Sequence, residues 1–508
     1  MKAGRKQWIG LAVLVLPVLL ISVDLHVLSY ALPFISASLA PSGSQLLWII
    51  DIYPFMLAGL LLPMGTLGDR VGRRRLLMAG AAAFGAASAV AAFSPSADLL
   101  IVTRALLGVG GATLMPSTLS LIRNMFHDDG QRRTAIAIWT GAFAGGAMLG
   151  PLMGGALLEH FWWGSVFLVN LPVMALLLIL APLLLPESCD PRPSRFDLLS
   201  VGLSLGAILP TIYGVQHIAQ DGIGWLPVLA IATGLALGVV FVRRQRSMAD
   251  PMLDVRLFSS RAFTAAISTN TLGVFAMVGS SLFTTQYLQM VMGARPLIAG
   301  LYALPSAGMA MLAAGLAPAL VRKVRPGLVV CAGLLVGATG FALLSQLDVT
   351  GQTGLLIAGI MLMAGGVTLV LTVSSDLIIA TAPPERAGSV AGLSQVATEF
   401  GGALGISLLG SIGTAVYRGH LADSGAPASA LDTLGGALET ARHLSEPAGI
   451  TLSATAREAF TQGQHYAMIA AAAGLSLMAL LAPVMLRSVR RAGQPRPHPD
   501  RSGRHVMR

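Results

Sequence analysis

Four ionisable residues lie inside long apolar stretches of the sequence, where ionisable side chains are rare. They are Asp24, Asp51, Arg104 and Glu399. A charge at the centre of a membrane helix costs at least about 2.5–3.5 kcal/mol on insertion scales, so such residues usually serve a function. A carboxylate in a low-dielectric environment can bind and release a proton near neutral pH, and its ionised form attracts cations. These residues could therefore transfer protons or bind a cationic ligand.

Helix geometry places three of the four at a similar depth. Asp24 lies about 24 Å along a helix that begins near Trp8, in a hydrocarbon core about 30 Å thick. Asp51 and Arg104 lie on helices of the opposite direction, each about 7–8 Å from the same face. Two carboxylates and a guanidinium could couple there. The alternative is that Asp24 or Asp51 forms a purely structural ion pair with Arg104.

Glu399 is predicted near the midplane of its own span, which contains no basic residue. A structural ion pair is therefore a weaker explanation for Glu399 than for the two aspartates. We expect Glu399 to take part in binding protons or substrate.

The elements that hold these residues are predicted to be membrane helices. Hydrophobic residues make up 55% of the 508 and charged residues only 11%, against about 25% in soluble domains. Fourteen apolar runs are long enough to span a membrane. The first run extends from Trp8 to about Phe34, which is too long for a cleaved signal peptide. We predict an all-α membrane protein with 14 transmembrane helices.

Basic residues predict the orientation of these helices. If the N-terminus is cytoplasmic, most of the 33 Lys and Arg residues fall in cytoplasmic segments. We therefore expect a multi-pass protein with both termini cytoplasmic, in contact with the lipid bilayer. The net charge of +10 reflects this bias and contact with anionic lipids. No aromatic residues interleave with the basic clusters, so we expect no nucleic-acid partner.

Residues that could hold a metal or perform covalent catalysis are not grouped in the sequence. The two cysteines, Cys189 and Cys331, have no metal-site or disulfide spacing. No His, Asp and Glu cluster has the spacing of a metal site or an activated nucleophile. We expect no metal, no cofactor and no catalytic residue, which argues against a membrane enzyme.

The chain divides by its loops into two halves and an insert. Basic clusters follow both the second and the tenth span, which suggests a repeated unit. Residues 419–464 form a long acidic connection in which leucines recur at helical spacing, so we predict an extracellular helical hairpin; a disordered loop is the alternative. The predicted units are an N-terminal six-helix bundle (1–190), a two-helix insert (191–255), a C-terminal six-helix bundle (256–490) with the hairpin (419–464), and a basic cytoplasmic tail (491–508).

Three motifs resemble those of the major facilitator superfamily. The first is its signature loop, carried here by Gly65, Gly68, Asp69, Arg70, Gly72, Arg73 and Arg74. Residues 104–112 resemble the fourth-helix arginine motif. The third resembles the fifth-helix antiporter motif, which is associated with exporters, and comprises Gly146, Gly150, Pro151, Gly154 and Gly155.

Further segments narrow the resemblance to one family. Residues 24–33, 48–53 and 397–401 resemble the fourteen-spanner drug:proton antiporters, in particular the quaternary-ammonium and dye exporters of the SmvA and QacA type. The resemblance implies two six-helix bundles plus a two-helix insert in a bacterial inner membrane. It also implies a monomeric secondary active transporter that exchanges protons for an organic cation by alternating access. The tenth span, 297–320, lacks the acidic residue of some divalent-cation exporters, so the preferred substrate charge stays open.

An alternative function within the superfamily is export of a neutral or anionic metabolite or antibiotic. The resemblance gives the two glycine-rich motifs distinct roles under either function. Asp69 and the arginines of the signature loop would join the bundles on the cytoplasmic side and so favour the outward-open state. The glycines of residues 146–155 remove side chains from one helix stripe, so that the fifth helix packs closely on a neighbour, which the resemblance places in the opposite bundle.

Overall fold

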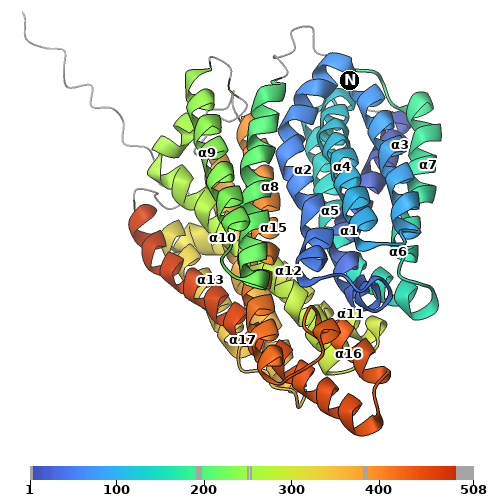
Figure 1. Ribbon diagram of the computed structural model, residues 1–508. Coiled ribbons are helices and arrows are strands. Elements are labelled where there is room, and N and C mark those ends of the chain that lie inside the picture. Colours follow the sequence, from blue (N-terminus) through green and yellow to red (C-terminus); the bar gives the residue numbers. More distant parts are fainter. Residues whose placement is uncertain (1–3, 190–196, 249–250, 252–254, 381–386, 488–508) are drawn as a thin grey trace, which may run out of the picture.

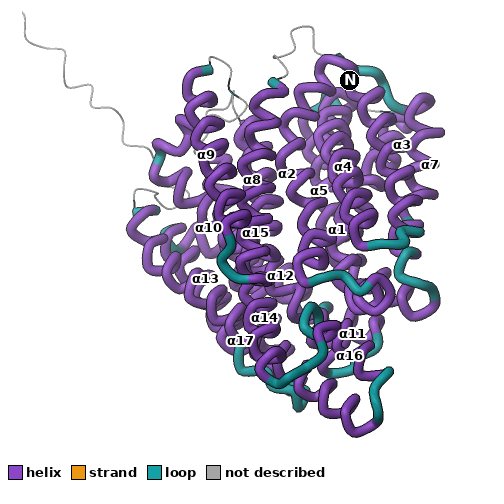
Figure 2. The backbone as a smooth tube through the Cα atoms, viewed as in Figure 1, coloured by secondary structure: helices purple, strands orange, loops and turns teal. Residues whose placement is uncertain are grey.

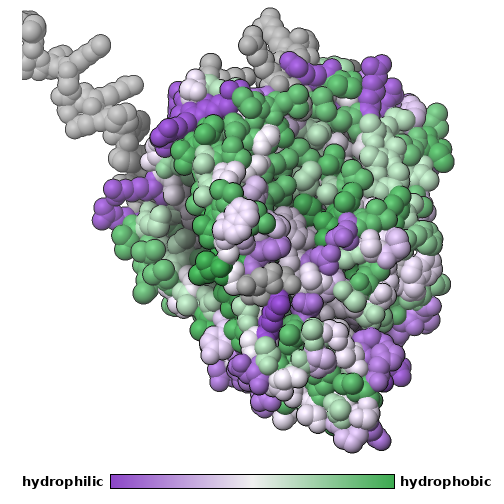
Figure 3. Space-filling view, in the orientation of Figure 1, coloured by the Kyte–Doolittle hydropathy of each residue, from purple (hydrophilic) through white to green (hydrophobic). Residues whose placement is uncertain are grey.

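The computed structural model describes residues 4–189, 197–248, 251, 255–380 and 387–487, and these ranges contain helices and no strand. Fourteen helical segments are long and apolar enough to cross a membrane, which confirms the predicted number of spans. The helices run roughly alongside one another (Figures 1 and 2). Hydrophobic side chains cover much of the visible face, and hydrophilic ones gather towards its upper and lower ends (Figure 3).

The first six spans and the insert follow each other in short steps. The first six are α1 (Arg5–Leu39), α2 (Gly43–Val71), α3 (Arg73–Ala92), α4 (Ala97–Met125), α5 (Asp129–His160), and α6 (Ser165–Leu168) with α7 (Asn170–Leu184). The insert consists of α8 (Leu198–Asp221) and α9 (Trp225–Ser247). α8 contacts α2 and also α15, so the insert touches both halves of the molecule.

The last six spans include two that are interrupted. They are α10 (Arg261–Gln286) continued by the π-helical turn η2 (Tyr287–Val291), α11 (Pro296–Tyr302) with α12 (Leu304–Lys323), α13 (Pro326–Leu344), α14 (Thr353–Ala380), α15 (Ala387–Asp423) and α17 (Glu446–Met485). A short helix, α16 (Leu434–Arg442), lies between α15 and α17. In Figure 1 the first residues of α1 lie at the top and α16 at the bottom. We call these the basic end, because the arginine-rich loop between α2 and α3 lies there, and the α16 end.

The region predicted as a hairpin is helical, with bounds different from those expected. α15 extends to Asp423, and α17 begins at Glu446, with Pro447 in its first turn. A Cβ placed on Gly449 of α17 would lie 2.4 Å from the carbonyl oxygen of Ala441, so α16 and the start of α17 pack as a helical pair. At 1.5 Å per residue, α17 is about 60 Å long, twice a membrane core of about 30 Å. Its first part therefore extends beyond the membrane.

Glycines allow backbone contact between two equivalent helix pairs. A Cβ on Gly146 of α5 would lie 2.5 Å from the carbonyl oxygen of Leu19 on α1. A Cβ on Gly405 of α15 would lie 2.0 Å from the carbonyl oxygen of Phe275 on α10. α1 and α5 are the first and fifth spans of the first half, and α10 and α15 are the first and fifth of the last six. The same contact thus occurs in both halves, which agrees with two repeated bundles.

We expected the glycines of residues 146–155 to pack against a helix of the opposite bundle. For most of these glycines the expectation was wrong. Gly146, Gly150 and Gly154 face α1 of their own half. Only the end of the motif reaches the opposite half: a Cβ on Gly155 would lie 2.6 Å from Cα of Leu297 on α11. The reason is helical spacing, since positions four residues apart share one face, whereas Gly155 follows Gly154 and faces another direction.

Two adjacent glycines of α5 provide a matched test of this packing. Gly146→Ala would place a methyl group against the α1 backbone, whereas a Cβ on Gly145 meets no atom within 4 Å. Overpacking of this kind costs about 1–3 kcal/mol. We expect Gly146→Ala to lower the thermal unfolding midpoint of the purified protein and Gly145→Ala to leave it unchanged. Equal midpoints for the two variants would contradict the close contact.

Candidate functional site

The Asp24 carboxylate and the Arg104 guanidinium form a buried ion pair between α1 and α4. Arg104 Nη1 lies 2.6 Å from Asp24 Oδ2, and both side chains are 1% exposed. Asp24 Oδ1 is buried and has no hydrogen-bond partner. The predicted proximity of these two residues is therefore present in the structure.

α2 supplies the other partners of Arg104. Arg104 Nε donates a hydrogen bond to the carbonyl oxygen of Ile49 at 3.1 Å. The guanidinium carbon lies 4.5 Å from the centre of the Tyr53 ring, a cation–π arrangement. Glycines bring the two helices together, since a Cβ on Gly108 of α4 would lie 2.7 Å from the carbonyl oxygen of Tyr53. Arg104 thus links α4 to both α1 and α2.

Asp51 is completely buried but does not pair with Arg104. Its Oδ2 accepts a hydrogen bond from the Gln216 side-chain amide of α8 at 3.2 Å. The same amide nitrogen lies 2.8 Å from Ser407 Oγ of α15. One amide group therefore bridges the first half, the insert and the second half.

Glu399 lies on α15, 7% exposed, with a neutral partner. Gln395, one helical turn earlier, donates from Nε2 to Glu399 Oε1 at 2.7 Å. The next residue, Phe400, packs edge-on against Phe55 of α2, with ring centres 6.4 Å apart. Glu399 therefore lies beside a contact between the two halves.

The four predicted residues thus separate into one ion pair and two carboxylates with uncharged partners. For Asp24, the structural ion pair left open by the sequence is the arrangement observed. For Asp51 it is not, because its described partners are an amide and a hydroxyl. Among the described residues, the side-chain partner of Glu399 is the uncharged Gln395.

The α16 end is closed by contacts between the halves. A Cβ on Gly300 of α11 would lie 2.6 Å from the carbonyl oxygen of Pro151 on α5, and one on Gly410 of α15 would lie 2.5 Å from Leu47 on α2. α16 adds to this closure, since a Cβ on Gly435 would lie 2.6 Å from Ser36 Cβ of α1. The structure therefore shows the state in which this end is sealed.

The signature motif at the basic end makes the following contacts within the first half, and its expected link between the bundles in the outward-open state stays a prediction. Asp69 pairs with Arg73 one turn later. The Arg74 backbone amide donates to Glu187 Oε1 at 3.0 Å, and its guanidinium donates to the carbonyl oxygen of Leu185 at 3.1 Å. In this structure the halves meet at the α16 end, which is the opposite state to the one in which that link is expected.

Gly65, Gly68 and Arg70 of the predicted loop lie in the last turns of α2. Gly72, between α2 and α3, has the strictest requirement. Its φ of 109° is in the region that favours glycine, and a Cβ there would lie 2.6 Å from Glu187 Oε1. This turn allows α3 to begin directly after α2.

Sequence reasoning missed the neutral side chains that complete the site. They are Tyr53, Gln216, Gln395 and Ser407. Ionisable residues inside a membrane helix stand out because they are costly there, whereas these four side chains are not charged. A signal existed for Gln216, because an amide near the end of an apolar span needs a hydrogen-bond partner when it is buried. No group of three or more metal-ligating side chains occurs within the described ranges.

Removing one member of the Asp24–Arg104 pair should be worse than removing both charges. A single change leaves a buried charge unpaired, which costs about 3–5 kcal/mol, whereas replacement of a whole pair is often tolerated. We expect Arg104→Met to reduce folded protein strongly and Asp24→Asn/Arg104→Met to recover part of the loss. Size-exclusion profiles and unfolding midpoints of all variants measure this. Additive losses in the double variant would show that the two side chains are energetically independent.

Comparison with known proteins identifies the family. Residues 14–406 match the model of the Major Facilitator Superfamily. The chain is 44% identical over 489 residues to the multidrug efflux pump LfrA of Mycolicibacterium smegmatis, covering 95% of both chains. It is 34% identical over 484 residues to the methyl viologen resistance protein SmvA of Salmonella typhimurium, covering 94% of this chain and 97% of that protein.

Solved structures agree on the fold. A bacterial homologue of the lysosomal transporter Spinster, in an inward-facing conformation, superposes with a TM-score of 0.65 at 19% identity, covering 96% of this chain and 98% of that one. The peptide transporter PepTSo gives 0.66 at 14% identity, with 96% and 99% covered. The chain is thus a multi-pass membrane transporter that belongs to the major facilitator superfamily and, within it, to the SmvA-like drug exporters.

Proposed function

We propose that this protein exports lipophilic cations, such as quaternary ammonium antiseptics and dyes, across a bacterial inner membrane in exchange for protons. One observation carries the proposal: Asp51 and Glu399 are buried carboxylates whose described partners are all uncharged. An ionised carboxylate in such a place is costly unless a positive charge joins it. A proton or a cationic substrate would each remove that cost.

Competition for the same carboxylates would produce antiport. A bound cation requires the ionised form, and a bound proton removes the negative charge that attracts the cation. Proton binding therefore expels the substrate, and substrate binding expels the proton.

The Asp24–Arg104 pair has a different proposed role. Because Asp24 already has a guanidinium partner, it offers no net negative charge to a cation. A proton on Asp24 would weaken the pair and free Arg104 from α1, while its bonds to α2 remain. We propose that protonation here changes how α1 packs on α2 and α4.

Sidedness follows from the basic loops. The positive-inside rule makes the basic end cytoplasmic and both termini cytoplasmic. The α16 end is then the exit side, and the state with this end sealed receives substrate from the cytoplasm or the inner leaflet. We propose that the protein acts as a monomer, since both carboxylates and the guanidinium lie within one chain.

The names of the relatives support a cationic substrate. SmvA is named for methyl viologen, an aromatic dication, and LfrA for multidrug efflux.

Export of a neutral or anionic compound is the competing function. Efflux of ethidium from proteoliposomes should be inhibited by tetraphenylphosphonium and not by an organic anion of similar size. The reverse pattern would overturn cation export.

Neutral substitutions of the two carboxylates should remove proton coupling. We expect Asp51→Asn and Glu399→Gln each to abolish ethidium efflux driven by an imposed pH gradient, because neither side chain can exchange a proton for a cation. Asp376→Asn, on the exposed face of α14, is the matched control and should transport normally. The measurement is dye efflux per reconstituted protein. Undiminished gradient-driven efflux in both carboxylate variants would contradict the mechanism.

Gln216 should act through Asp51, and another buried glutamine of the insert provides the control. Gln216→Leu removes the amide that holds the Asp51 carboxylate, and a hydrogen bond to a charged group is worth about 1.5–3 kcal/mol. We expect efflux to fall about tenfold or more and its pH optimum to shift. Gln245→Leu removes a bond to Ser200 within the insert and should change neither. An identical pH profile for Gln216→Leu and the unmodified protein would show that Gln216 is only structural.

A further inference from the structure

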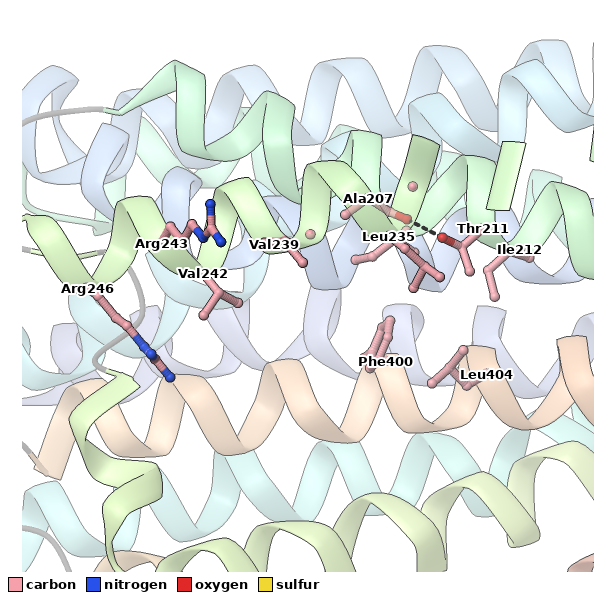
Figure 4. Close-up of a pocket in the computed structure, with 13 residues that line it drawn as sticks. Ala207, Thr211, Ile212, Leu235, Val239, Val242, Arg243, Arg246, Phe400 and Leu404 are labelled. Carbon is pink, nitrogen blue, oxygen red and sulfur yellow. Dashed lines mark hydrogen bonds between the residues drawn. The ribbon is translucent and has the colours of Figure 1, made fainter. Parts of the chain in front are cut away.

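An apolar groove lies between the insert and the second half, apart from the carboxylates. Its walls come from α8, α9 and α15, and its volume is about 590 Å³. Ile208 and Leu235 line it on the insert side and Phe400 and Leu404 on the α15 side. In Figure 4 the side chains of Leu235, Phe400 and Leu404 border a common space between the helices. The groove has the lining expected for a hydrocarbon chain.

Two arginines lie at one end of this groove. Arg243 and Arg246 of α9 line it at the basic end and are exposed. In Figure 4 the Arg246 side chain extends from α9 towards the space between α9 and α15. The length of α9 from Leu235 to Arg246 is about 17 Å, close to half of a membrane core of about 30 Å. The groove therefore fits one leaflet, with the arginines at headgroup level.

The arginine between these two is already neutralised, which leaves the flanking pair available. Arg244 forms an ion pair with Asp197 at 3.0 Å. Burial alone would raise the pKa of Asp197, but hydrogen bonds from Arg244 and Ser200 lower it below its usual value. The structure describes no ion pair for Arg243 or Arg246 with an acidic residue of the ranges it covers. An anionic ligand would supply the missing charge.

We propose that this groove binds an anionic phospholipid, with one acyl chain between α8, α9 and α15 and the phosphate held by Arg243 and Arg246. Guanidinium groups bind phosphate through paired hydrogen bonds. The same two charges repel a lipophilic cation, so the groove is distinct from the proposed substrate site. The positive-inside rule places the lipid in the inner leaflet, although binding itself does not depend on that orientation.

The occupied groove would also support the contact between the halves. Phe400 lines the groove and packs on Phe55 of α2. Ile212 of α8 belongs to the same small apolar cluster. An acyl chain against Phe400 therefore fills space behind this cluster, and a bound anionic lipid should raise the stability of the sealed state.

The test is native mass spectrometry of the delipidated full-length protein with equal amounts of phosphatidylglycerol and phosphatidylethanolamine of the same chains. We expect one phosphatidylglycerol to bind in preference. Each basic residue near an anionic lipid surface contributes to the free energy of binding. The double variant Arg243→Gln/Arg246→Gln should therefore weaken this binding roughly tenfold or more. Arg322→Gln/Lys323→Gln, which removes two exposed basic residues at the end of α12, should not. Equal losses in the two double variants would reduce the effect to general surface charge and overturn the proposal.

A second variant distinguishes binding of the lipid's acyl chain from binding of its headgroup. A Cβ on Gly238 would meet only Ala207 Cβ at 3.6 Å, so Gly238→Leu should fold normally and fill the groove while both arginines remain. We expect it to lose phosphatidylglycerol binding as well, with an unchanged unfolding midpoint in detergent alone. Full binding in Gly238→Leu would show that the groove is not the chain site. Displacement of the lipid by tetraphenylphosphonium would instead assign the groove to the substrate and contradict a lipid site.

Discussion

The fold depends on satisfying a guanidinium in the interior of a membrane protein. Arg104 is 1% exposed, so its charge needs partners from the protein itself. It obtains them from the Asp24 carboxylate on α1 and from the Ile49 carbonyl and Tyr53 ring on α2. Three helices that bury mainly apolar side chains are thereby fixed in one arrangement. Apolar packing alone would allow several, because lipid tails are as apolar as leucine.

Two other buried carboxylates, one in each half, have neutral partners. Among the described residues Glu399 of α15 accepts from the Gln395 amide, and Asp51 of α2 shares the Gln216 amide with Ser407 of α15. These arrangements provide hydrogen bonds without compensating charge and leave Asp51 Oδ1 without a described partner, so they suit carboxylates whose protonation changes. The insert is therefore more than a spacer, because Gln216 of α8 completes the environment of Asp51.

The sequence was informative where a single residue type reveals an energetic cost of burial. Placing Asp24 or Arg104 in an apolar run is expensive whatever surrounds it, so both residues and their shared depth could be predicted. The partner of Asp51 could not, because Gln216 is 165 positions away and its orientation depends on how the insert docks. The helical character of residues 419–464 was predicted, but the start of α17 was not, because residues 446–464 are more polar than a membrane span and yet continue it as one helix. The contacts of the signature loop depend on conformational state, which a sequence does not specify.

The helix α15 connects the chemistry to the closure of the molecule. Glu399 and Phe400 are adjacent on it, so charge at the first residue and the Phe400–Phe55 contact move as one rigid unit. Gly401 and Gly405 follow directly, and their backbone contact with α10 leaves no side chain to resist sliding. In the first half α5 holds the equivalent position, with glycines against α1 and Gly155 against α11. A change of charge at Glu399 would therefore act on the contact between α15 and α2, and the contact of α5 with α11 is its equivalent in the other pair of helices.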